Sequence, residues 1–259
     1  MSTRAKREFG QHFLADENLL GVIGRLAELD DVDVVLEIGP GLGVLTSYLA
    51  EHVSHVHAIE LDRSLEPKLR EALVGRDNVE LHFGDALGLD LGALEPAPTK
   101  LVANLPYNVA TPLIAESLDG LPNVGLWCVM VQREVADRFF AATETKAYGA
   151  VSVLVQLAAE RTGFHPVSRN VFRPRPNVDS ALVAFRRRRE LPADYPLLKA
   201  VVGAAFAHRR KQLPNSLELA GLCSRAQAVA ALARIGREPS TRAEALEPDE
   251  FVALAHALE

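Results

Sequence analysis

A glycine-rich turn between an apolar strand and a helix constrains the fold of this 259-residue chain most strongly. Residues 32–38 form an apolar run that leads into Gly39-Pro-Gly-Leu-Gly43, and a helical pattern begins at Val44. This order is typical of the first unit of a nucleotide-binding α/β domain, because the glycines let the backbone pass close to a ligand that the helix N-terminus faces. The spacing does not match the dinucleotide fingerprint G-x-G-x-x-G. It favours a nucleoside ligand without a pyrophosphate, such as S-adenosylmethionine, and disfavours a nicotinamide-dependent oxidoreductase.

Two further predicted strands lead into acidic side chains. Residues 55–59 lead into Glu60, which follows Gly43 by 17 residues. That offset is near the roughly 20 residues at which an acidic residue accepts a hydrogen bond from a ribose hydroxyl. Residues 79–83 precede Asp85, which suits either an adenine amino group or an ordinary turn or helix N-cap. Since parallel strands end at one edge of a sheet, the sequence predicts a ligand site at this edge.

A fourth predicted strand, residues 101–103, ends in the motif Asn104-Leu105-Pro106-Tyr107. The motif places an amide, a proline-constrained backbone and an aromatic ring together, a set that suits gripping a flat ring bearing an amino group. The alternative is a strand-terminal turn with a buried tyrosine. The predicted acidic residues at the neighbouring strand ends favour the functional interpretation.

The second half of the chain predicts one more strand, then a mixed region and a helical lobe. We expect a strand over 126–131, helices near 109–118 and 151–160, and β-like stretches at 162–167 and 180–186. A proline-containing linker follows Leu191. The predicted helices beyond it span roughly 197–208, 209–222, 225–235 and 248–258. We therefore place a domain boundary after residue 190, with residues 1–190 as one domain and 191–259 as a small all-α domain.

Charge is distributed unevenly along the chain. Its net charge is −6, yet residues 161–215 hold 12 basic and 3 acidic side chains, a local charge of +9 that leaves −15 for the rest. Such asymmetry is typical of a surface that meets a polyanion, although a solvated charged surface is the simpler reading of any one run. Two isolated cysteines, no signal-like N-terminus and no apolar run of about 20 residues favour a cytoplasmic protein without a membrane span.

Together these segments resemble the ribosomal RNA adenine N6-dimethyltransferase family, whose bacterial members modify two adjacent adenosines near the 3′ end of 16S rRNA. The resemblance covers essentially the whole chain. The segments in which the chain resembles the family are Phe9–Leu14, Glu37–Gly43, Glu60–Asp62, Gly84–Leu87, Asn104–Tyr107, Phe172–Ser180 and His208–Leu213 with Asn215-Ser216. It implies a Rossmann-like class I methyltransferase fold, with a seven-stranded sheet whose last strand is antiparallel, and a helical C-terminal RNA-binding domain.

The resemblance also implies roles for single residues. His12 and Leu14 would close over S-adenosylmethionine, although many bacterial members have Asn at the position of His12. The other implied cofactor contacts are Gly39 and Gly41 with the methionine part, Glu60 with the ribose, Asp85 and Ala86 with the adenine, and Asn104. The implied RNA contacts are Arg173, Arg175, Arg209, Arg210 and Lys211, with Arg4, Lys6 and Arg7 as possible additions.

The chemistry that this assignment requires is the activation of a poor nucleophile, because the lone pair of the adenine amine is delocalised into the ring. Asn104 Oδ1 and the backbone carbonyl of Leu105 would hold the two N–H groups and favour a pyramidal nitrogen. Pro106 restricts Leu105 to extended conformations. Tyr107 and Phe172 would stack on the two faces of the base, each contact worth about 1–3 kcal/mol. Methyl transfer would leave S-adenosylhomocysteine. No metal is expected, because no cluster of His, Cys and carboxylate residues is evident in the sequence.

Two alternatives stay open at this stage. One is a methyltransferase that modifies a large-subunit (23S) rRNA adenine and confers macrolide resistance; the segment 172–180 and a helix carrying Arg209–Lys211 favour the small-subunit enzyme. The other is a non-catalytic ribosome assembly factor on the same fold, which the intact Asn104 and Tyr107 disfavour. The expected partner is 16S rRNA in an immature small subunit, met by a monomer.

Overall fold

The computed structural model describes residues 12–14, 16, 18–188, 190–192 and 194–259. The basic residues Arg4, Lys6 and Arg7, and the start of the segment Phe9–Leu14, lie outside the described residues. Contacts divide the chain into two compact units, one of residues 1–136 with 160–187 and one of residues 137–159 with 188–259. The units interleave in sequence, and the domain boundary expected after residue 190 stays a prediction.

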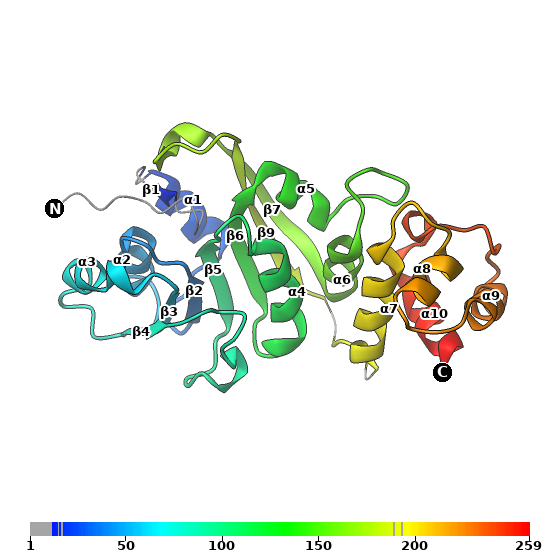
Figure 1. Cartoon of the computed structure of the whole chain (residues 1–259). Coiled ribbons are helices and arrows are strands. Elements are labelled where there is room, and N and C mark those ends of the chain that lie inside the picture. The colour runs from blue at the N-terminus through cyan, green and yellow to red at the C-terminus, as the bar shows by residue number, and fades with distance from the viewer. Residues whose placement is uncertain (1–11, 15, 17, 189, 193) are drawn as a thin grey trace. The chain divides into compact units, whose positions relative to one another are not determined.

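The first unit is built on a seven-stranded sheet with the strand order β4-β3-β2-β5-β6-β9-β7 (Figure 1). The strands in chain order are β2 (Val34–Ile38), β3 (His55–Glu60), β4 (Val79–Phe83), β5 (Lys100–Asn104), β6 (Leu126–Gln132), β7 (Ala159–Val167) and β9 (Ser180–Arg187). Neighbouring strands from β4 to β6 are parallel, and β9 is antiparallel to β6. This confirms the predicted Rossmann-like class I methyltransferase fold.

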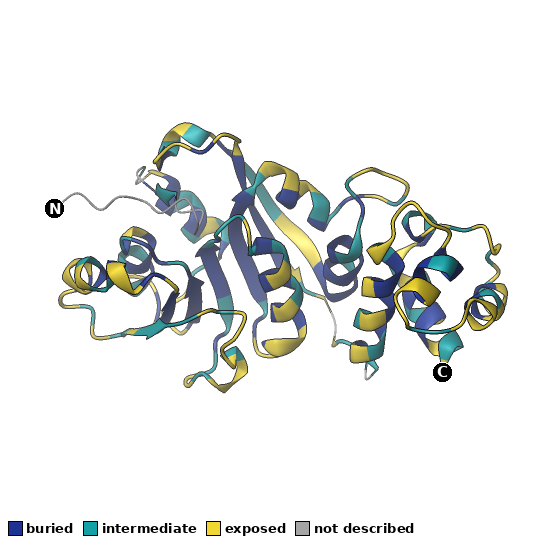
Figure 2. Cartoon of the chain, in the orientation of Figure 1, coloured by how far each residue is buried: buried dark blue, intermediate teal, exposed yellow. Residues whose placement is uncertain are grey.

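The central strands carry continuous apolar runs because helices cover both faces of the sheet. Residues Leu126–Val131 of β6 are all buried, as Figure 2 shows for the centre of the sheet. On one face, α1 (Asn18–Leu26) and α2 (Val44–Ala50) join a core cluster with alternate strand residues. On the other face, the Trp127 indole donates to Ser117 Oγ of α4 (Ala110–Gly120) at 2.9 Å.

Two short segments that lie far apart in sequence form a separate ribbon. Strand β1 (Phe13–Leu14) pairs antiparallel with β8 (Phe172–Arg173), so that Phe13 faces Arg173 and Leu14 faces Phe172. Helices α3 (Glu66–Ala72) and α5 (Arg133–Phe139) complete the regular structure of this half of the chain. Neither half of the ribbon has a periodicity that sequence could reveal, because each strand has two residues.

The second unit is helical. Its helices are α6 (Ala150–Ala158), α7 (Tyr195–Ala207), α8 (Leu213–Leu219), α9 (Arg225–Arg234) and α10 (Pro248–Leu258). The ring of Phe206 lies between Tyr148 and Phe251, with centroids 5.9 and 5.8 Å away. Arg237 donates two hydrogen bonds to the Glu250 carboxylate, at 2.6 and 2.7 Å. The helical structure expected in residues 191–259 is thereby confirmed.

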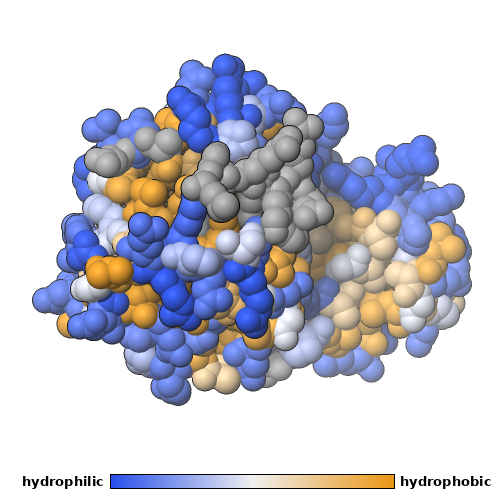
Figure 3. Space-filling model, turned by 60° about the vertical axis from the view of Figure 1, so that its left-hand side comes forward, coloured by the Kyte–Doolittle hydropathy of each residue, from blue (hydrophilic) through white to orange (hydrophobic). Residues whose placement is uncertain are grey.

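One predicted element is wrong. Residues 209–211, expected on a helix, form a turn between α7 and α8, because α7 ends at Ala207 and α8 begins only at Leu213. Among the described residues, no helix is both long and apolar enough to cross a membrane. On the face drawn in Figure 3, hydrophilic residues separate the apolar patches.

Candidate active site

A cavity opens at the edge where β2, β3 and β5 end. Each of these strands delivers a polar side chain there, namely Glu37, Glu60 and Asn104. The lining residues come from five segments: His12–Leu14, Glu37, Gly39–Leu42 with Val44 and Leu45, Glu60, and Asn104–Tyr107. The structure thus brings together all of the predicted cofactor-binding residues except Asp85 and Ala86.

The glycine turn holds the backbone in conformations that other residues rarely adopt. Gly39 and Gly41 have φ values of +79° and +61°. A Cβ atom at Gly41 would lie 2.9 Å from Cδ1 of Phe13, closer than packed carbon atoms approach. Any larger residue at position 41 would therefore have to displace Phe13, so glycine keeps the turn open to the cavity.

Glu60 is fixed by main-chain donors. Its Oε2 accepts from the Gly41 amide at 3.0 Å, and its Oε1 accepts from the Asp62 amide at 2.8 Å. The residue is only 5% exposed, and this burial raises the pKa of its carboxyl although the amide hydrogen bonds act in the opposite direction. Each oxygen still has a second lone pair, which suits the hydroxyl groups of a ribose.

Glu37 is a second buried carboxylate in the cavity wall, and we did not assign it a role from sequence. It is 1% exposed, and its Oε2 has no hydrogen-bond partner among the described residues. Burial raises the pKa of Glu37 to about 8. The buried Thr46 hydroxyl beside it acts in the opposite direction, and the charge of Glu60 adds to the rise. The sequence signal for Glu37 was an acidic residue within an otherwise apolar strand, one residue before that strand ends.

Asn104 and Tyr107 form the other end of the cavity. The Asn104 side chain donates from Nδ2 to the backbone carbonyl of His12 at 3.0 Å, which directs Oδ1 to the opposite side of the amide. Leu105 is buried, and its amide donates to the Met130 carbonyl at 3.0 Å, so the chain is anchored directly after β5. The Tyr107 hydroxyl lies 2.6 Å from Ser180 Oγ, which holds the ring in place.

The segment around His12 covers Tyr107. His12 Nδ1 donates to the carbonyl of Pro174 at 2.8 Å, and its ring centroid lies 5.4 Å from that of Tyr107. His12 and Leu14 both line the cavity. A histidine in place of the usual Asn therefore still reaches this site, with its ring nitrogen bonded to the β8 side of the ribbon.

Phe172 does not line the cavity, contrary to the expectation that it offers a second stacking face. It is fully buried in the core cluster, with Leu14 paired opposite it. The physical reason is the β1–β8 ribbon, which turns this ring toward α1 and the sheet instead of toward Tyr107. The stacking role of Phe172 stays a prediction. In this arrangement its ring does not line the cavity beside Tyr107.

Asp85 and Ala86 also lie outside the cavity. Asp85 Oδ1 accepts from the Leu87 amide at 3.0 Å, the turn geometry that was the alternative reading of this residue. Ala86 lines a different hollow, together with Leu89 and Leu113. The adenine contact assigned to this pair stays a prediction.

The predicted RNA-binding side chains are all exposed. On the first unit, the Arg173 guanidinium donates to the carbonyls of Phe172 and Asn170, and Arg175 follows two residues later. On the second unit, Arg209 donates to the carbonyls of Tyr148 at 2.7 Å and Lys146 at 3.2 Å. These bonds leave the positive charges at the surface, where phosphates can reach them.

Comparisons with known proteins agree with this geometry. Residues 2–259 match the family described as ribosomal RNA adenine dimethylase. A small-subunit ribosomal RNA methyltransferase A of Rubrobacter xylanophilus is 49% identical, over 97% of this chain and 94% of that protein. The protein of the same name from Lactococcus lactis is 42% identical, over 98% and 90% of the two chains.

Two solved structures show the fold. A dimethyladenosine transferase from Plasmodium falciparum superposes with a TM-score of 0.76 at 23% identity, over 94% of this chain and 96% of that one. The 23S rRNA methyltransferase ErmE superposes with a TM-score of 0.65 at 29% identity, over 95% and 99%.

The fold and the cavity define a class I methyltransferase, with the glycine turn and Glu60 on one side of the cavity and Asn104 and Tyr107 on the other. The match over residues 2–259 then makes the assignment specific. The chain belongs to the ribosomal RNA adenine dimethylase family, whose members are methyltransferases dependent on S-adenosylmethionine.

Proposed function

We propose that this protein transfers methyl groups from S-adenosylmethionine to the N6 amines of two adjacent adenosines near the 3′ end of 16S rRNA. The observation that carries the proposal is the single cavity in which Glu60 and the glycine turn face Asn104 and Tyr107. The two relatives at 49% and 42% identity, both named for the small ribosomal subunit, support this choice of RNA.

The residues present fit the cofactor. Glu60, already held by two amides, would bind the ribose hydroxyls, and the turn at Gly39 and Gly41 would lie against the methionine part. The unpartnered Oε2 of Glu37 in the cavity wall suits a polar hydrogen of the ligand, since buried acceptors in proteins are normally satisfied. When bound, the cofactor supplies an electrophilic methyl group on sulfur.

At the other end of the cavity, this chain's own groups would orient the target amine. Asn104 Oδ1 and the Leu105 carbonyl accept its two N–H groups, so that the nitrogen lone pair is left for the methyl group. Tyr107 stacks on the base, which must leave its helical stack to enter the site. The step depends on orienting the amine more than on a strong base. The proposed reaction therefore assigns no role to a metal.

The RNA is expected to bind through the exposed cations Arg173, Arg175, Arg209, Arg210 and Lys211. Phosphate contacts of this kind hold an RNA without reading its sequence, so specificity would come from the shape of the loop that presents the adenosines. We further propose that the substrate is an immature small subunit in the cytoplasm, and that the enzyme acts as a monomer.

The proposal is tested by incubating the protein with labelled S-adenosylmethionine and small subunits from cells that lack the modification. Nucleoside analysis should detect N6,N6-dimethyladenosine, and mapping should place it at two adjacent positions near the 3′ end of 16S rRNA. Label found only in 23S rRNA would support the large-subunit alternative. Stable binding to subunits without any label would support an assembly factor instead.

A further inference from the structure

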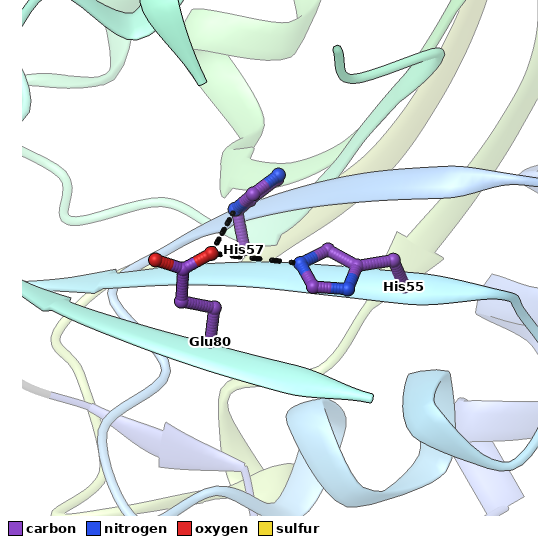
Figure 4. Close-up of side chains that lie close together, drawn as sticks. All are labelled: His55, His57 and Glu80. Atoms are coloured by element: carbon purple, nitrogen blue, oxygen red, sulfur yellow. Dashed lines mark ion pairs between the residues drawn. The ribbon is translucent and has the colours of Figure 1, made fainter. Parts of the chain in front are cut away.

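A cluster of histidine and glutamate side chains lies on strands β3 and β4. His55 and His57 alternate along β3, and Glu80 and His82 alternate along β4, so all four project from one face of the sheet. The two strands are parallel, with His57 directly opposite Glu80. Figure 4 shows the two rings and the Glu80 carboxylate pointing toward one another. Ligand atoms of His55, His57 and Glu80 all lie within 4.8 Å of each other.

The tautomer of His57 is set by its environment. Its Nε2 lies 2.9 Å from the carbonyl of Pro96, which can only accept, so Nε2 carries the hydrogen. In the neutral ring Nδ1 is therefore an acceptor, and this atom faces the cluster. A carbonyl that holds the far nitrogen of an imidazole is the usual outer partner of a metal-binding histidine.

The spacing within the cluster is long for hydrogen bonds. Glu80 Oε2 lies 3.6 Å from His57 Nδ1 and 3.8 Å from His55 Nε2. His55 Nε2 is buried and has no hydrogen-bond partner among the described residues. Ligand atoms at about 2.0–2.1 Å from a tetrahedral Zn²⁺ lie roughly 3.4 Å apart. The two separations from Glu80 Oε2 are therefore within about 0.4 Å of the value that such an ion imposes, and the two histidine nitrogens lie within 4.8 Å of each other.

A polar network without an ion is the competing explanation. His82 Nε2 lies 3.3 Å from His57 Nδ1 and donates to it, and it lies 3.7 Å from Glu80 Oε1. That single long hydrogen bond leaves His55 Nε2 without a partner, so the network does not satisfy its own members. The Glu80 side chain is 51% exposed and the His55 side chain 23%, which gives an ion a path from solvent to the fully buried His57.

We propose that His55 Nε2, His57 Nδ1 and the Glu80 carboxylate form a site for a divalent transition-metal cation, with Zn²⁺ as the ion that this donor set suits best. Two neutral imidazoles and one carboxylate are a common zinc ligand set, and they leave a fourth position for water or for His82. The site joins the edge strand β4 to β3. The sequence showed no cluster of His, Cys and carboxylate residues, whereas the structure brings His55, His57 and Glu80 together. The cluster was missed because its members come from two different strands.

Zinc binding is measured by calorimetry on the untagged full-length protein, first stripped with a chelator. We expect one Zn²⁺ per chain, a higher Tm with the ion, and intense visible absorption from Co²⁺ bound in its place. His55→Gln and Glu80→Gln should each weaken Zn²⁺ binding at least tenfold. The matched controls His52→Gln and Glu71→Gln, at exposed positions outside the cluster, should bind as the unaltered protein does.

Two results would overturn the proposal. One is the absence of stoichiometric binding to the unaltered protein, and the other is equal affinity in the cluster variants and the controls. If His55→Gln does not fold, as judged by its Tm in chelator, Glu80→Gln decides the question because Glu80 lies at the surface. None of these outcomes bears on methyl transfer, since the cluster lies toward the opposite end of β3 from Glu60.

Discussion

The two ends of the active-site cavity are built by different means. At the cofactor end, main-chain amides of Gly41 and Asp62 hold Glu60, so strand ends and a turn fix the site by themselves. At the adenine end, side chains hold the parts together, through the Asn104–His12 and Tyr107–Ser180 hydrogen bonds. The cofactor end is thus formed by strand ends and a turn, whereas the adenine end depends on side-chain hydrogen bonds to His12 and Ser180.

Replacing Asn104 should have the largest effect and would separate the two ends most clearly. Asn104→Ala removes one of the two proposed acceptors, and we expect methyl transfer to fall by about 10²–10³-fold, as for loss of one group that orients a reacting atom. Cofactor affinity measured by calorimetry should largely persist. Asn108→Ala, an exposed amide nearby, is the control, and a complete loss of cofactor binding in Asn104→Ala would make this residue a cofactor anchor instead.

Tyr107 tests whether the ring or its hydroxyl matters at the adenine end. Tyr107→Ala removes a stacking contact worth about 1–3 kcal/mol, which corresponds to roughly 5- to 150-fold in kcat/KM. Tyr107→Phe keeps the ring and loses only the bond to Ser180, so its kcat/KM should fall by less than about tenfold. Equal losses in both variants would show that the hydroxyl, and not stacking, is what the reaction needs.

Glu60 provides the corresponding test at the cofactor end. Glu60→Gln removes the charge that strengthens hydrogen bonds to ribose hydroxyls, and we expect the cofactor Kd to rise about tenfold. RNA binding, measured by filter retention, should not change. A variant with unaltered cofactor Kd would show that the two amide bonds to Glu60 are purely structural.

Replacing Phe172 tests whether this residue serves only the core or also stacks on the target base. Because the ring is fully buried, Phe172→Leu should lower the Tm by several degrees, while the folded protein should retain methyl transfer to within about twofold. A selective loss of transfer with an unchanged Tm would instead restore the stacking role. Phe164→Leu, which alters a partly exposed ring of the same unit, serves as the comparison.

Glu37 predicts a pH dependence of stability rather than of transfer. Burial raises its pKa from 4.5 to about 8, so between these values the folded state holds a proton that the unfolded state has released. The free energy of unfolding should therefore fall as the pH rises from about 5 to 8. Glu37→Gln should flatten this decline in Tm measurements, and Glu71→Gln, at an exposed position, should not. A wild-type Tm that rises through this range would contradict the assignment.

Sequence predicted the parts of the fold that depend on local pattern. Long apolar strands, the glycine turn at Gly39–Gly43 and the amphipathic helices each have a pattern within their own residues. Such a pattern can be recognised without knowing which other segment the element packs against. The β1–β8 ribbon has none, because two-residue strands carry no pattern and lie far apart in the chain. That ribbon decides which way Phe172 points, so the burial of this ring could not be predicted from the sequence.

The candidate site shows the same division. Glu60 and Asn104 were predicted because each follows an apolar strand directly. Asp85 also follows one, but its turn directs the carboxylate to Leu87, which depends on backbone angles that sequence does not give. The orphaned oxygen of Glu37 and the meeting of His57 with Glu80 depend on packing and strand register. Both were therefore visible only in three dimensions.

The hydrogen bond from Asn104 Nδ2 to the His12 carbonyl limits which residues position 104 can tolerate. An amide offers a donor on one side and an acceptor on the other; the donor is bound to His12, and the proposed reaction uses the acceptor. Aspartate would turn an acceptor toward the carbonyl of His12 and bring a negative charge beside the methyl donor. Serine and alanine would be too short to span the gap. Asparagine therefore keeps the bond to the His12 carbonyl and leaves an acceptor for the target amine of the proposed reaction.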